Sequence, residues 1–577
     1  MKRSINALLQ CALASLSVSS AWATDSYNPA NNQLTIPSVS AAGTTYYNVV
    51  ITVGTILGAT QGGTPKGTVD SYDAALNQLS IPSVTVNGVT YTNALITVGK
   101  ILSVGGIMAS FPGLIYQRDA ATAYKANTSG EGIAAASISS GSGAFAALSD
   151  SSGRFALSMP ATVKASDTLT INVPGYIPIG IDRSIVDTKT PFNSFGLYPT
   201  QTVLKKPGFL LGVYTMDSGG ELINMFTEGK FAPTYDRIVE KTSANLVGIS
   251  DPAWVTAWDD TAATVTMSRN ASIPMLTKDQ YRYLTDLAKQ RNLKFLMQIG
   301  LYPDAGVTLP YSVSATNNLF WNAWFAAYKT IVLEQVQIAN ELGIEYISLG
   351  MNNSFMTYQQ ASRWSDLVNS VRAAGYKGKL LYQGMTDLAS GGDESTGYDP
   401  SFVKLFDYLA IDIYTLAPAT GGSPVVSRSE MKKNVSSLLA KYAAYPVPLL
   451  IMVGTPSVES GATSSEYIEP CLPCGAAATR NTLDLFTQAD AYQAIFEAIN
   501  DGKTGNGNVV GLLSWGYWYS NNYRLQLNSV TGELNGDDAL NDSAGTGRAD
   551  DYAYDKSASV RGKPAESLLK WWMDNIK

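Results

Sequence analysis

The sequence predicts a multidomain protein with two N-terminal all-β repeats, a small β-sandwich and a C-terminal α/β barrel of the TIM (β/α)8 type. Three observations predict this organisation. A β-rich motif repeats near the N-terminus, strand-like runs of alternating hydrophobicity follow it, and from residue 205 onward short apolar runs alternate with amphipathic segments. At 577 residues the chain is long enough for one large core with accessory modules.

The composition excludes several classes of function. The net charge is -7 and no cluster of Lys and Arg is present, which argues against nucleic-acid binding. The chain contains no His, so Ser-His-Asp triads, Cys-His pairs, His-ligated zinc and imidazole bases are all excluded. Any catalysis would depend on carboxylates, Tyr, Lys or Cys, and we expect no cofactor.

Residues 1–23 have the pattern of a secretory signal peptide. Lys2 and Arg3 precede an apolar stretch from Leu8 to Leu16, and Ala21-Trp-Ala23 provides a small-residue cleavage site. No later segment approaches the roughly 18 apolar residues of a transmembrane helix. The mature protein is therefore expected to be secreted, extracellular or at the cell surface, with the periplasm as an alternative.

Two cysteines, Cys471 and Cys474, remain once Cys11 leaves with the signal peptide. In an oxidising compartment the Cys-Leu-Pro-Cys turn predicts a small disulfide loop. A metal site would need two more soft ligands, and the sequence has neither another Cys nor a His to supply them. We therefore expect no metal site.

Residues 24–108 contain two copies of one motif. Asp25-Ser-Tyr-Asn-Pro-Ala-Asn-Asn-Gln-Leu-Thr-Ile-Pro-Ser-Val39 recurs as Asp70-Ser-Tyr-Asp-Ala-Ala-Leu-Asn-Gln-Leu-Ser-Ile-Pro-Ser-Val84. Each copy continues across a Gly-containing turn into a second β-rich run, which predicts a hairpin-like unit of about 45 residues. The pair resembles short N-terminal repeats of many secreted bacterial proteins. A spacer or surface-association role is expected, with ligand binding as the alternative.

Residues 109–200 contain three strand-like runs at residues 132–138, 150–157 and 167–176, punctuated by Gly and Pro. They resemble the small carboxypeptidase-regulatory-type β-sandwich. That resemblance implies a structural or adhesive module and no catalysis.

Residues 205–577 are expected to form the barrel, because eight strand-length runs can be counted and eight parallel strands close a barrel. The runs cover residues 208–214, 244–250, 294–300, 346–350, 379–383, 408–414, 448–453 and 509–515. Between them, Thr277-Lys-Asp-Gln280 and Thr357-Tyr-Gln-Gln360 are typical of capping boxes that open helices, and a longer helix is expected from about Trp321 to Leu342.

Several ordered motifs in this region resemble (β/α)8 glycoside hydrolases of the endoglycosidase clan. They are Thr277-Lys-Asp-Gln280, Leu287-Ala-Lys-Gln-Arg-Asn-Leu-Lys-Phe-Leu-Met-Gln298, Phe406-Asp-Tyr-Leu-Ala-Ile-Asp-Ile-Tyr414, Gly511-Leu-Leu-Ser-Trp-Gly516 and Arg561-Gly-Lys-Pro-Ala-Glu566. The resemblance covers about 365 residues. It implies a catalytic pair of glutamates, one ending the fourth strand as acid/base and one ending the seventh as nucleophile.

The resemblance places inert side chains at both catalytic positions. The fourth strand ends in Leu349-Gly-Met-Asn352 and the seventh in Ile451-Met-Val-Gly454, so Asn352 and Met452 stand where glutamates are expected. An amide cannot deliver a proton at neutral pH, and a thioether cannot form a glycosyl ester. The two-glutamate mechanism is therefore predicted to be absent.

Other carboxylates are weaker catalytic candidates. Asp412 lies inside the sixth strand run, Asp387 follows the fifth and Glu459 follows Met452 by seven residues. The alternative for Asp412 is a hydrogen-bonded interior carboxylate, and the alternative for Glu459 is a solvated loop acid.

Side chains suited to sugar binding fall at or after several strand ends. Aromatic rings stack on the apolar faces of sugars, and amides bond to sugar hydroxyls. The candidate substrate-binding residues are Trp254, Tyr414, Trp515, Trp518, Asn352 and Asn353.

Three functional hypotheses follow. The leading one is a secreted barrel that binds an extracellular polysaccharide or cell-surface glycan and has lost the usual acid pair. The alternatives are an active glycosidase that uses displaced carboxylates, and a structural or surface-assembly protein. The acidic, Gly-rich run at residues 535–547 does not match the calcium loop of EF-hands, so a solvated loop is expected there.

Overall fold

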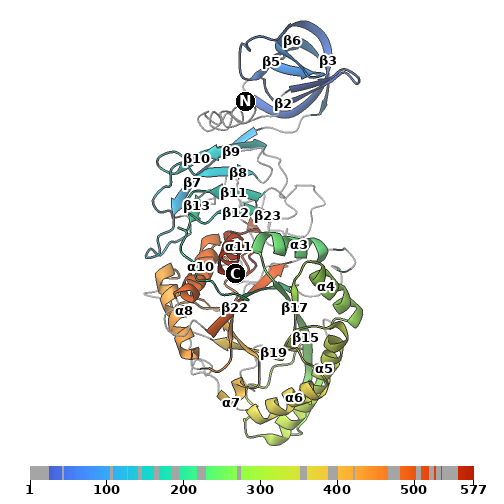
Figure 1. Ribbon diagram of the computed structural model, residues 1–577, viewed down its shortest axis with the longest axis vertical. Helices are drawn as coiled ribbons and strands as arrows, with labels where there is room; N and C mark the ends of the chain where they lie inside the picture. Colours follow the sequence, from blue (N-terminus) through green and yellow to red (C-terminus); the bar gives the residue numbers. More distant parts are fainter. Residues whose placement is uncertain are drawn as a thin grey trace, which may run out of the picture. The chain divides into compact units, whose positions relative to one another are not determined.

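The computed structural model is described below for the parts of the chain whose placement is defined (Figure 1). These are residues 25–41, 44–103, 108–126, 128–140, 146–160, 168–182, 194–216, 226, 229, 231–269, 275–350, 360–386, 400–419, 423–443, 445–464, 481–501, 508–518, 526–527, 534–535 and 556–577. The predicted signal peptide, residues 1–23, lies outside them.

The two N-terminal repeats form a single barrel-like sheet of six strands. The strand order is β1-β2-β3-β6-β5-β4, and two further parallel pairings, β1 with β5 and β2 with β4, join the repeats. The strands of the two predicted hairpin-like units are present. The prediction did not include the pairing between the units, in which strands of each repeat join strands of the other in one sheet. The strands are β1 (Asp25–Asn28), β2 (Gln33–Ala41), β3 (Thr44–Gln61), β4 (Asp70–Asp73), β5 (Gln78–Val86) and β6 (Val89–Ser103).

Equivalent residues of the two repeats make equivalent bonds, so the sheet has an internal pseudo-twofold symmetry. Asn32 and Asn77 both adopt left-handed backbone angles, with φ of 53° and 49°. The Asn32 side-chain amide donates to the Val53 carbonyl at 2.9 Å, and that of Asn77 donates to the Val98 carbonyl at 3.0 Å. Asparagine tolerates this backbone region better than other L-residues, which accounts for its place in both turns.

The symmetry brings two acidic side chains together inside the sheet. Asp25 and Asp70 open the two repeats, are 6% and 8% exposed, and interact with each other through a side-chain hydrogen bond. Burial, together with the neighbouring Asp70 carboxylate, raises the pKa of Asp25 to about 8, and burial raises the pKa of Asp70 to about 6. The pair therefore retains a shared proton near neutral pH.

The acid pair should make the N-terminal sheet less stable as the pH rises. Between the unfolded pKa of 3.8 and the folded pKa of about 8, folded Asp25 binds more protons than the unfolded chain, so the stability falls with increasing pH. We expect hydrogen exchange of residues 25–103 in the full chain, corrected for intrinsic rates, to be better protected at pH 5 than at pH 9. Asp25→Asn should flatten this dependence, whereas Asp73→Asn, at the exposed end of β4, should leave it unchanged. A wild-type stability that rises with pH would contradict the assignment.

Two small antiparallel sheets lie in the region where the sequence predicts a β-sandwich. In the first, β7 (Met108–Gln117) pairs with β10 (Arg154–Pro160). In the second, β8 (Ser137–Ser140) pairs with both β9 (Ala146–Leu148) and β11 (Thr168–Asn172). Strands β12 (Ile179–Asp182) and β13 (Ser194–Leu197) follow along the chain.

The C-terminal region is a closed barrel of eight parallel strands, as predicted. The strand order is β14-β22-β21-β20-β19-β18-β17-β15, and β14 also pairs with β15 to close the ring. The barrel strands are β14 (Leu210–Met216), β15 (Leu246–Asp259), β17 (Lys294–Pro303), β18 (Tyr346–Ser348), β19 (Lys379–Thr386), β20 (Tyr408–Ile413), β21 (Leu449–Val453) and β22 (Val509–Trp518). Strand β15 continues beyond the barrel and pairs antiparallel with β16 (Thr264–Ser268). Two further short strands, β23 (Gln526–Leu527) and β24 (Leu534–Asn535), pair with each other.

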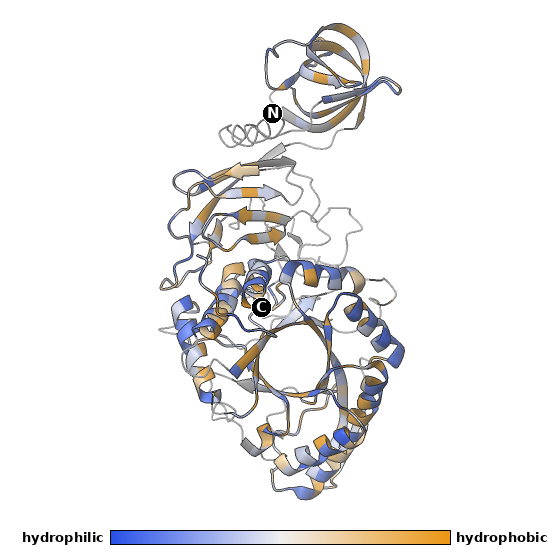
Figure 2. Ribbon diagram, viewed as in Figure 1, coloured by the Kyte–Doolittle hydropathy of each residue, from blue (hydrophilic) through white to orange (hydrophobic). Residues whose placement is uncertain are grey.

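Helices surround the barrel, with polar residues facing outward and apolar residues facing the strands (Figure 2). The capping box predicted at Thr277 is present, and Tyr281, Leu284 and Leu287 are buried as expected. The second predicted capping box starts at Thr357, outside the described residues, and its helix begins at Ala361. The helices are α3 (Phe231–Thr242), α4 (Lys278–Gln290), α5 (Asn318–Leu342), α6 (Ala361–Ala373), α7 (Pro400–Val403), α8 (Arg428–Tyr442), α10 (Leu485–Asn500) and α11 (Pro564–Ile576). In the described part of the chain, none of them is long and apolar enough to cross a membrane.

Each barrel strand contributes to two separate cores, because successive side chains point to opposite faces. In β21, Leu450 and Met452 belong to the cluster inside the barrel, while Leu449, Ile451 and Val453 belong to the cluster between strands and helices. The continuous apolar run in the sequence is thus explained by burial of both faces.

Candidate functional site

The candidate site lies inside the barrel, toward the ends of strands β20 to β22. Met452, the residue that the resemblance aligns with the nucleophile, is fully buried and belongs to the interior cluster. In the strand register Met452 stands beside Asp412 on one side and Leu513 on the other. A thioether therefore occupies the inner face of the seventh strand.

Asp412 points into the barrel and is part of a buried chain of polar side chains. The Gln383 amide donates to the Asp412 carboxylate at 3.0 Å, and the Gln298 amide donates to Gln383. All three residues are at most 1% exposed. The alternative raised from the sequence for Asp412, a hydrogen-bonded interior carboxylate, matches this geometry.

The eight strands carry only two other acidic residues, and neither faces the interior. Asp251 lies on the outer side of β15, where the Tyr281 hydroxyl donates to it at 2.5 Å and the Leu276 amide at 3.1 Å. Burial raises the pKa of Asp251 to about 7. Asp259 is exposed at the β15–β16 turn, where it accepts bonds from turn amides. Asp412 is thus the one interior carboxylate of these eight strands.

Four aromatic side chains gather near the same end of the barrel. The rings of Trp254 and Tyr302 lie 5.8 Å apart, and those of Tyr214 and Trp515 lie 5.2 Å apart. Trp254 and Tyr302 are partly exposed, whereas Tyr214 and Trp515 are buried in the interior cluster. Tyr414, also partly exposed, lies against Gly454 at the end of β21. The structure therefore brings the predicted residues Trp254, Tyr414 and Trp515 to one end of the barrel.

Two polar atoms of this interior have no hydrogen-bond partner among the described residues. They are the Tyr214 hydroxyl and the Gln298 side-chain carbonyl. Burial raises the pKa of Tyr214 well above its ordinary value, with a further contribution from the Asp412 charge, so its hydroxyl remains a donor. A buried polar group without a partner is unfavourable by about 1 to 3 kcal/mol, and such groups at a site are satisfied by water or by a ligand.

Sequence reasoning missed Tyr214, Gln298 and Ser250 as site residues. The Ser250 and Tyr302 hydroxyls lie 3.3 Å apart at this end of the barrel. The sequence does contain a signal for Gln298, because this polar residue interrupts the apolar run Lys294-Phe-Leu-Met-Gln-Ile-Gly300. Side chains alternate between the two faces of a strand, so Gln298 shares the inward face with Leu296.

The weak catalytic candidate Glu459 is not a freely solvated loop acid. Its carboxylate accepts a hydrogen bond from the Ala126 amide at 3.1 Å, and its backbone amide donates to the Thr482 carbonyl at 2.9 Å. These contacts give Glu459 a structural role in holding Ala126 and Thr482 in place.

The loop after β17 does not enter the interior cluster. Its residue Val313 packs in the outer core, and Trp258 of the β15–β16 hairpin donates to the Thr308 carbonyl at 2.6 Å. Of the segment from Tyr302 to Asn317, these residues therefore lie outside the interior, whereas Tyr302 packs against the interior cluster.

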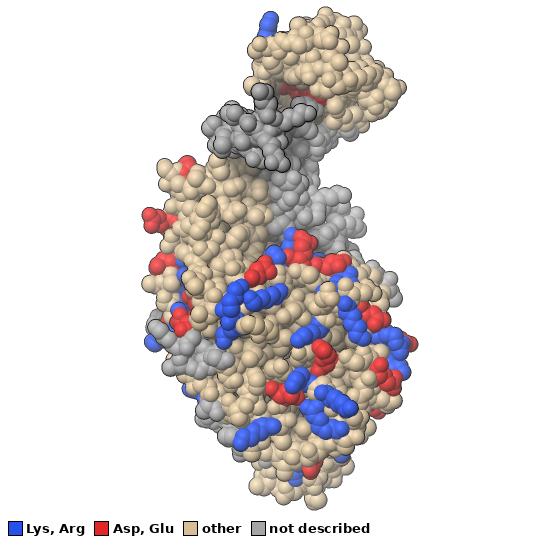
Figure 3. Space-filling model, in the orientation of Figure 1, with Lys and Arg blue, Asp and Glu red and all other residues tan. Residues whose placement is uncertain are grey.

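Several predicted residues lie outside the described part of the chain. They are Asn352, Asn353, Asp387, Cys471, Cys474, the side chain of Trp518 and residues 536–547. Within the described part, no group of three or more Cys, Asp and Glu side chains could hold a metal ion. On the face of the barrel seen in Figure 3, charges of both signs are interspersed.

Residues 252–528, slightly less than half of the chain, match the family model of Glycoside Hydrolase Family 113. The match begins within β15 and runs past β22, so most of the barrel is similar to glycoside hydrolases of this family. No curated protein matches the chain significantly.

Solved structures with a similar chain trace were also found. A GH113 beta-1,4-mannanase is 18% identical, with a TM-score of 0.45, and the match covers 63% of this chain and 99% of that chain. The GH113 beta-mannanase from Alicyclobacillus acidocaldarius is 17% identical, with a TM-score of 0.44, covering 64% of this chain and 98% of that chain. An exo-beta-1,4-mannosidase from Opitutaceae bacterium strain TAV5 is 13% identical, with a TM-score of 0.36, covering 65% of this chain and 61% of that chain.

Proposed function

We propose that the glycoside-hydrolase-type barrel binds an extracellular polysaccharide at the carboxyl ends of its strands and does not hydrolyse it by the two-glutamate mechanism. The observation that carries the proposal is the buried Met452 at the inner end of β21, beside the single interior carboxylate of the eight strands, Asp412. Glycoside hydrolysis needs two carboxyl groups facing one glycosidic bond. One carboxylate held by Gln383 does not provide that pair.

The aromatic residues and the unpartnered polar atoms support the binding half of the proposal. Trp254, Tyr302 and Tyr414 offer partly exposed rings near one end of the barrel, where sugar faces can stack. Tyr214 and Gln298 supply one donor and one acceptor that have no partner among the described residues. A polyhydroxylated ligand matches both features, because sugars combine apolar faces with many hydroxyls.

Binding should depend on the partly exposed Trp254. We expect Trp254→Ala to weaken binding by about tenfold or more, since loss of one well-packed aromatic contact is worth about 1.5 kcal/mol or more. Isothermal titration with a panel of soluble β-linked polysaccharides that includes β-1,4-mannan would measure this. Tyr283→Ala, which truncates an exposed aromatic residue on helix α4, is the matched control and should bind as the wild type does.

The same panel tests for hydrolysis. We expect no release of reducing ends above the rate without protein. Turnover that Asp412→Asn abolishes would replace the binding proposal with a glycosidase that uses a displaced carboxylate. The absence of both binding and turnover across the panel would favour a structural or assembly role.

The remaining sequence-based expectations accompany this function as proposals. They are membership of the endoglycosidase clan, substitution of its acid/base by Asn352, the carboxypeptidase-regulatory-like sandwich, secretion with cleavage before Thr24, surface association through the repeats, and the disulfide between Cys471 and Cys474. N-terminal sequencing of the exported protein and titration of free thiols under denaturing conditions test the secretion and the disulfide.

A further inference from the structure

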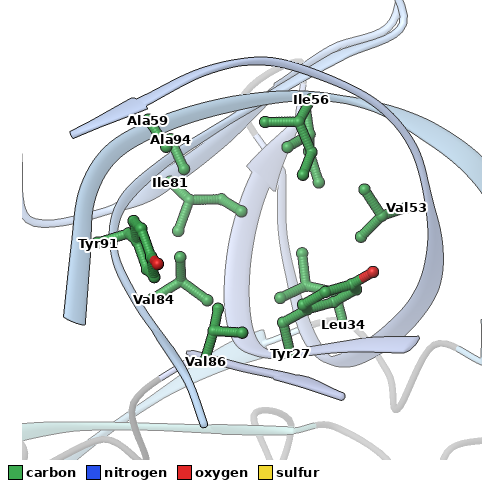
Figure 4. A pocket seen from close by; sticks show the side chains of 11 residues that line it. Tyr27, Leu34, Val53, Ile56, Ala59, Ile81, Val84, Val86, Tyr91 and Ala94 are labelled. Atoms are coloured by element: carbon green, nitrogen blue, oxygen red, sulfur yellow. The ribbon is translucent and has the colours of Figure 1, made fainter. Parts of the chain in front are cut away.

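The N-terminal barrel-like sheet encloses an apolar pocket between its two repeats (Figure 4). Its volume is about 310 Å³, at the lower end of the range of small-molecule pockets, about 300 to 1,000 Å³. Repeat one supplies five lining residues, including Tyr27, Leu34 and Val53, and repeat two supplies six, including Val84 and Tyr91. The pocket therefore exists only because the repeats share one sheet.

The chemistry of the lining restricts what the pocket can hold. Nine of the eleven lining residues are Leu, Ile, Val or Ala, and the other two are Tyr27 and Tyr91. The Tyr27 hydroxyl already donates to the Asn32 side chain at 2.9 Å, so this residue presents its ring to the pocket. A sugar or a charged group would lose its hydrogen bonds to water without replacement, which makes either a poor ligand here.

The surroundings of the pocket are also suited to an apolar ligand. Ile56 lines the pocket yet is 62% exposed, and the adjacent Leu57 is 47% exposed. Residues 25–103 contain only five charged side chains, and two of these, Asp25 and Asp70, are buried. Figure 3 shows an almost uncharged surface on this part of the molecule.

We propose that this pocket binds a single aliphatic chain, the acyl chain of a fatty acid or of a membrane lipid, with the polar head left outside next to Ile56. An apolar cavity of about 150 Å³ is enough to bind benzene, so about twice that volume has room for roughly ten to twelve carbon atoms. The driving force is the removal of apolar surface from water on both the chain and the pocket wall. This site is separate from the barrel and does not depend on the function proposed for it.

The test uses the full chain and the apolar fluorophore N-phenyl-1-naphthylamine. We expect its fluorescence to rise on binding and dodecanoic acid to displace it. Ala59→Trp, a substitution at an exposed lining position, fills the pocket and should weaken dodecanoate binding about tenfold or more, because several buried methylene contacts are lost. Ala75→Trp, at an exposed turn position of the same sheet that does not line the pocket, is the matched control.

A second variant keeps the test informative if Ala59→Trp does not fold. Ile56→Asp puts a charge at the exposed rim and should also weaken binding, with hydrogen exchange of residues 25–103 unchanged. Displacement by dodecanoate supports a free acyl chain, and cosedimentation with phosphatidylcholine vesicles that Ala59→Trp abolishes supports a lipid acyl chain. Equal binding by the wild type and Ala59→Trp, or no binding of either probe by the folded wild type, would overturn the proposal.

Discussion

Replacing Asp490 by alanine is expected to destabilise the barrel by about 3 to 5 kcal/mol, because the buried Arg118 guanidinium would lose its carboxylate and Arg428 would keep only Glu497, 3.3 Å away. Arg118 makes an ion pair with Asp490 at 2.6 Å, and Arg428 lies 3.7 Å from its other oxygen. The Tyr198 hydroxyl also donates to Asp490, at 2.9 Å. All three charged side chains are no more than 6% exposed, so water cannot replace the lost partner.

Urea unfolding followed by tryptophan fluorescence measures this effect selectively, because nine of the ten tryptophans lie in residues 205–577. The control is Asp279→Ala, which removes an exposed ion pair with Arg282 on helix α4 and should change the stability by no more than about 1 kcal/mol. A second control, the triple substitution Asp490→Leu, Arg118→Met and Arg428→Met, should recover part of the loss. If Asp490→Ala were no more destabilising than Asp279→Ala, the network would not support the barrel.

Introducing a glutamate at Met452 is expected to destabilise the barrel by about 3 to 5 kcal/mol at pH 7. The new carboxylate would be buried beside Asp412, its neighbour in the strand register. Burial and the like charge would both raise the pKa of the pair, so the folded state would hold more protons than the unfolded chain. The loss should therefore be largest above neutral pH and smaller near pH 4.

Met452→Gln distinguishes the effect of the buried charge on stability from the effect of the altered side-chain shape. It places an uncharged side chain of similar length at the same position, so its effect should be about 1 to 3 kcal/mol and nearly independent of pH. The tryptophan-monitored unfolding of both variants at pH 4, 7 and 8.5 provides the comparison. Equal stability of the two variants at every pH would mean that residue 452 does not face Asp412 inside the barrel.

The barrel could be predicted well from the sequence, because its signals are local and repeated. Eight apolar runs of strand length, separated by helical patterns, correspond to the eight observed strands, and the capping box at Thr277 begins a helix as expected. The resemblance aligned Met452 with the nucleophile position, and the structure places this residue in the interior cluster. The inner chain of Gln298, Gln383 and Asp412 could not be predicted as a unit, because it joins strands that are far apart in the sequence.

The N-terminal repeats likewise separate what the sequence predicts, which is local structure, from what it does not predict, which is pairing between distant strands. The sequence alone determined that residues 25–39 and 70–84 have the same local structure, because turns and alternation depend on neighbouring residues. Only the tertiary structure decided that the two copies interlock, that Asp25 meets Asp70, and that an apolar pocket lies between them. These features arise from parallel pairings between residues about 30 and 60 positions apart, and no local pattern of side chains specifies which distant strand a given strand will join.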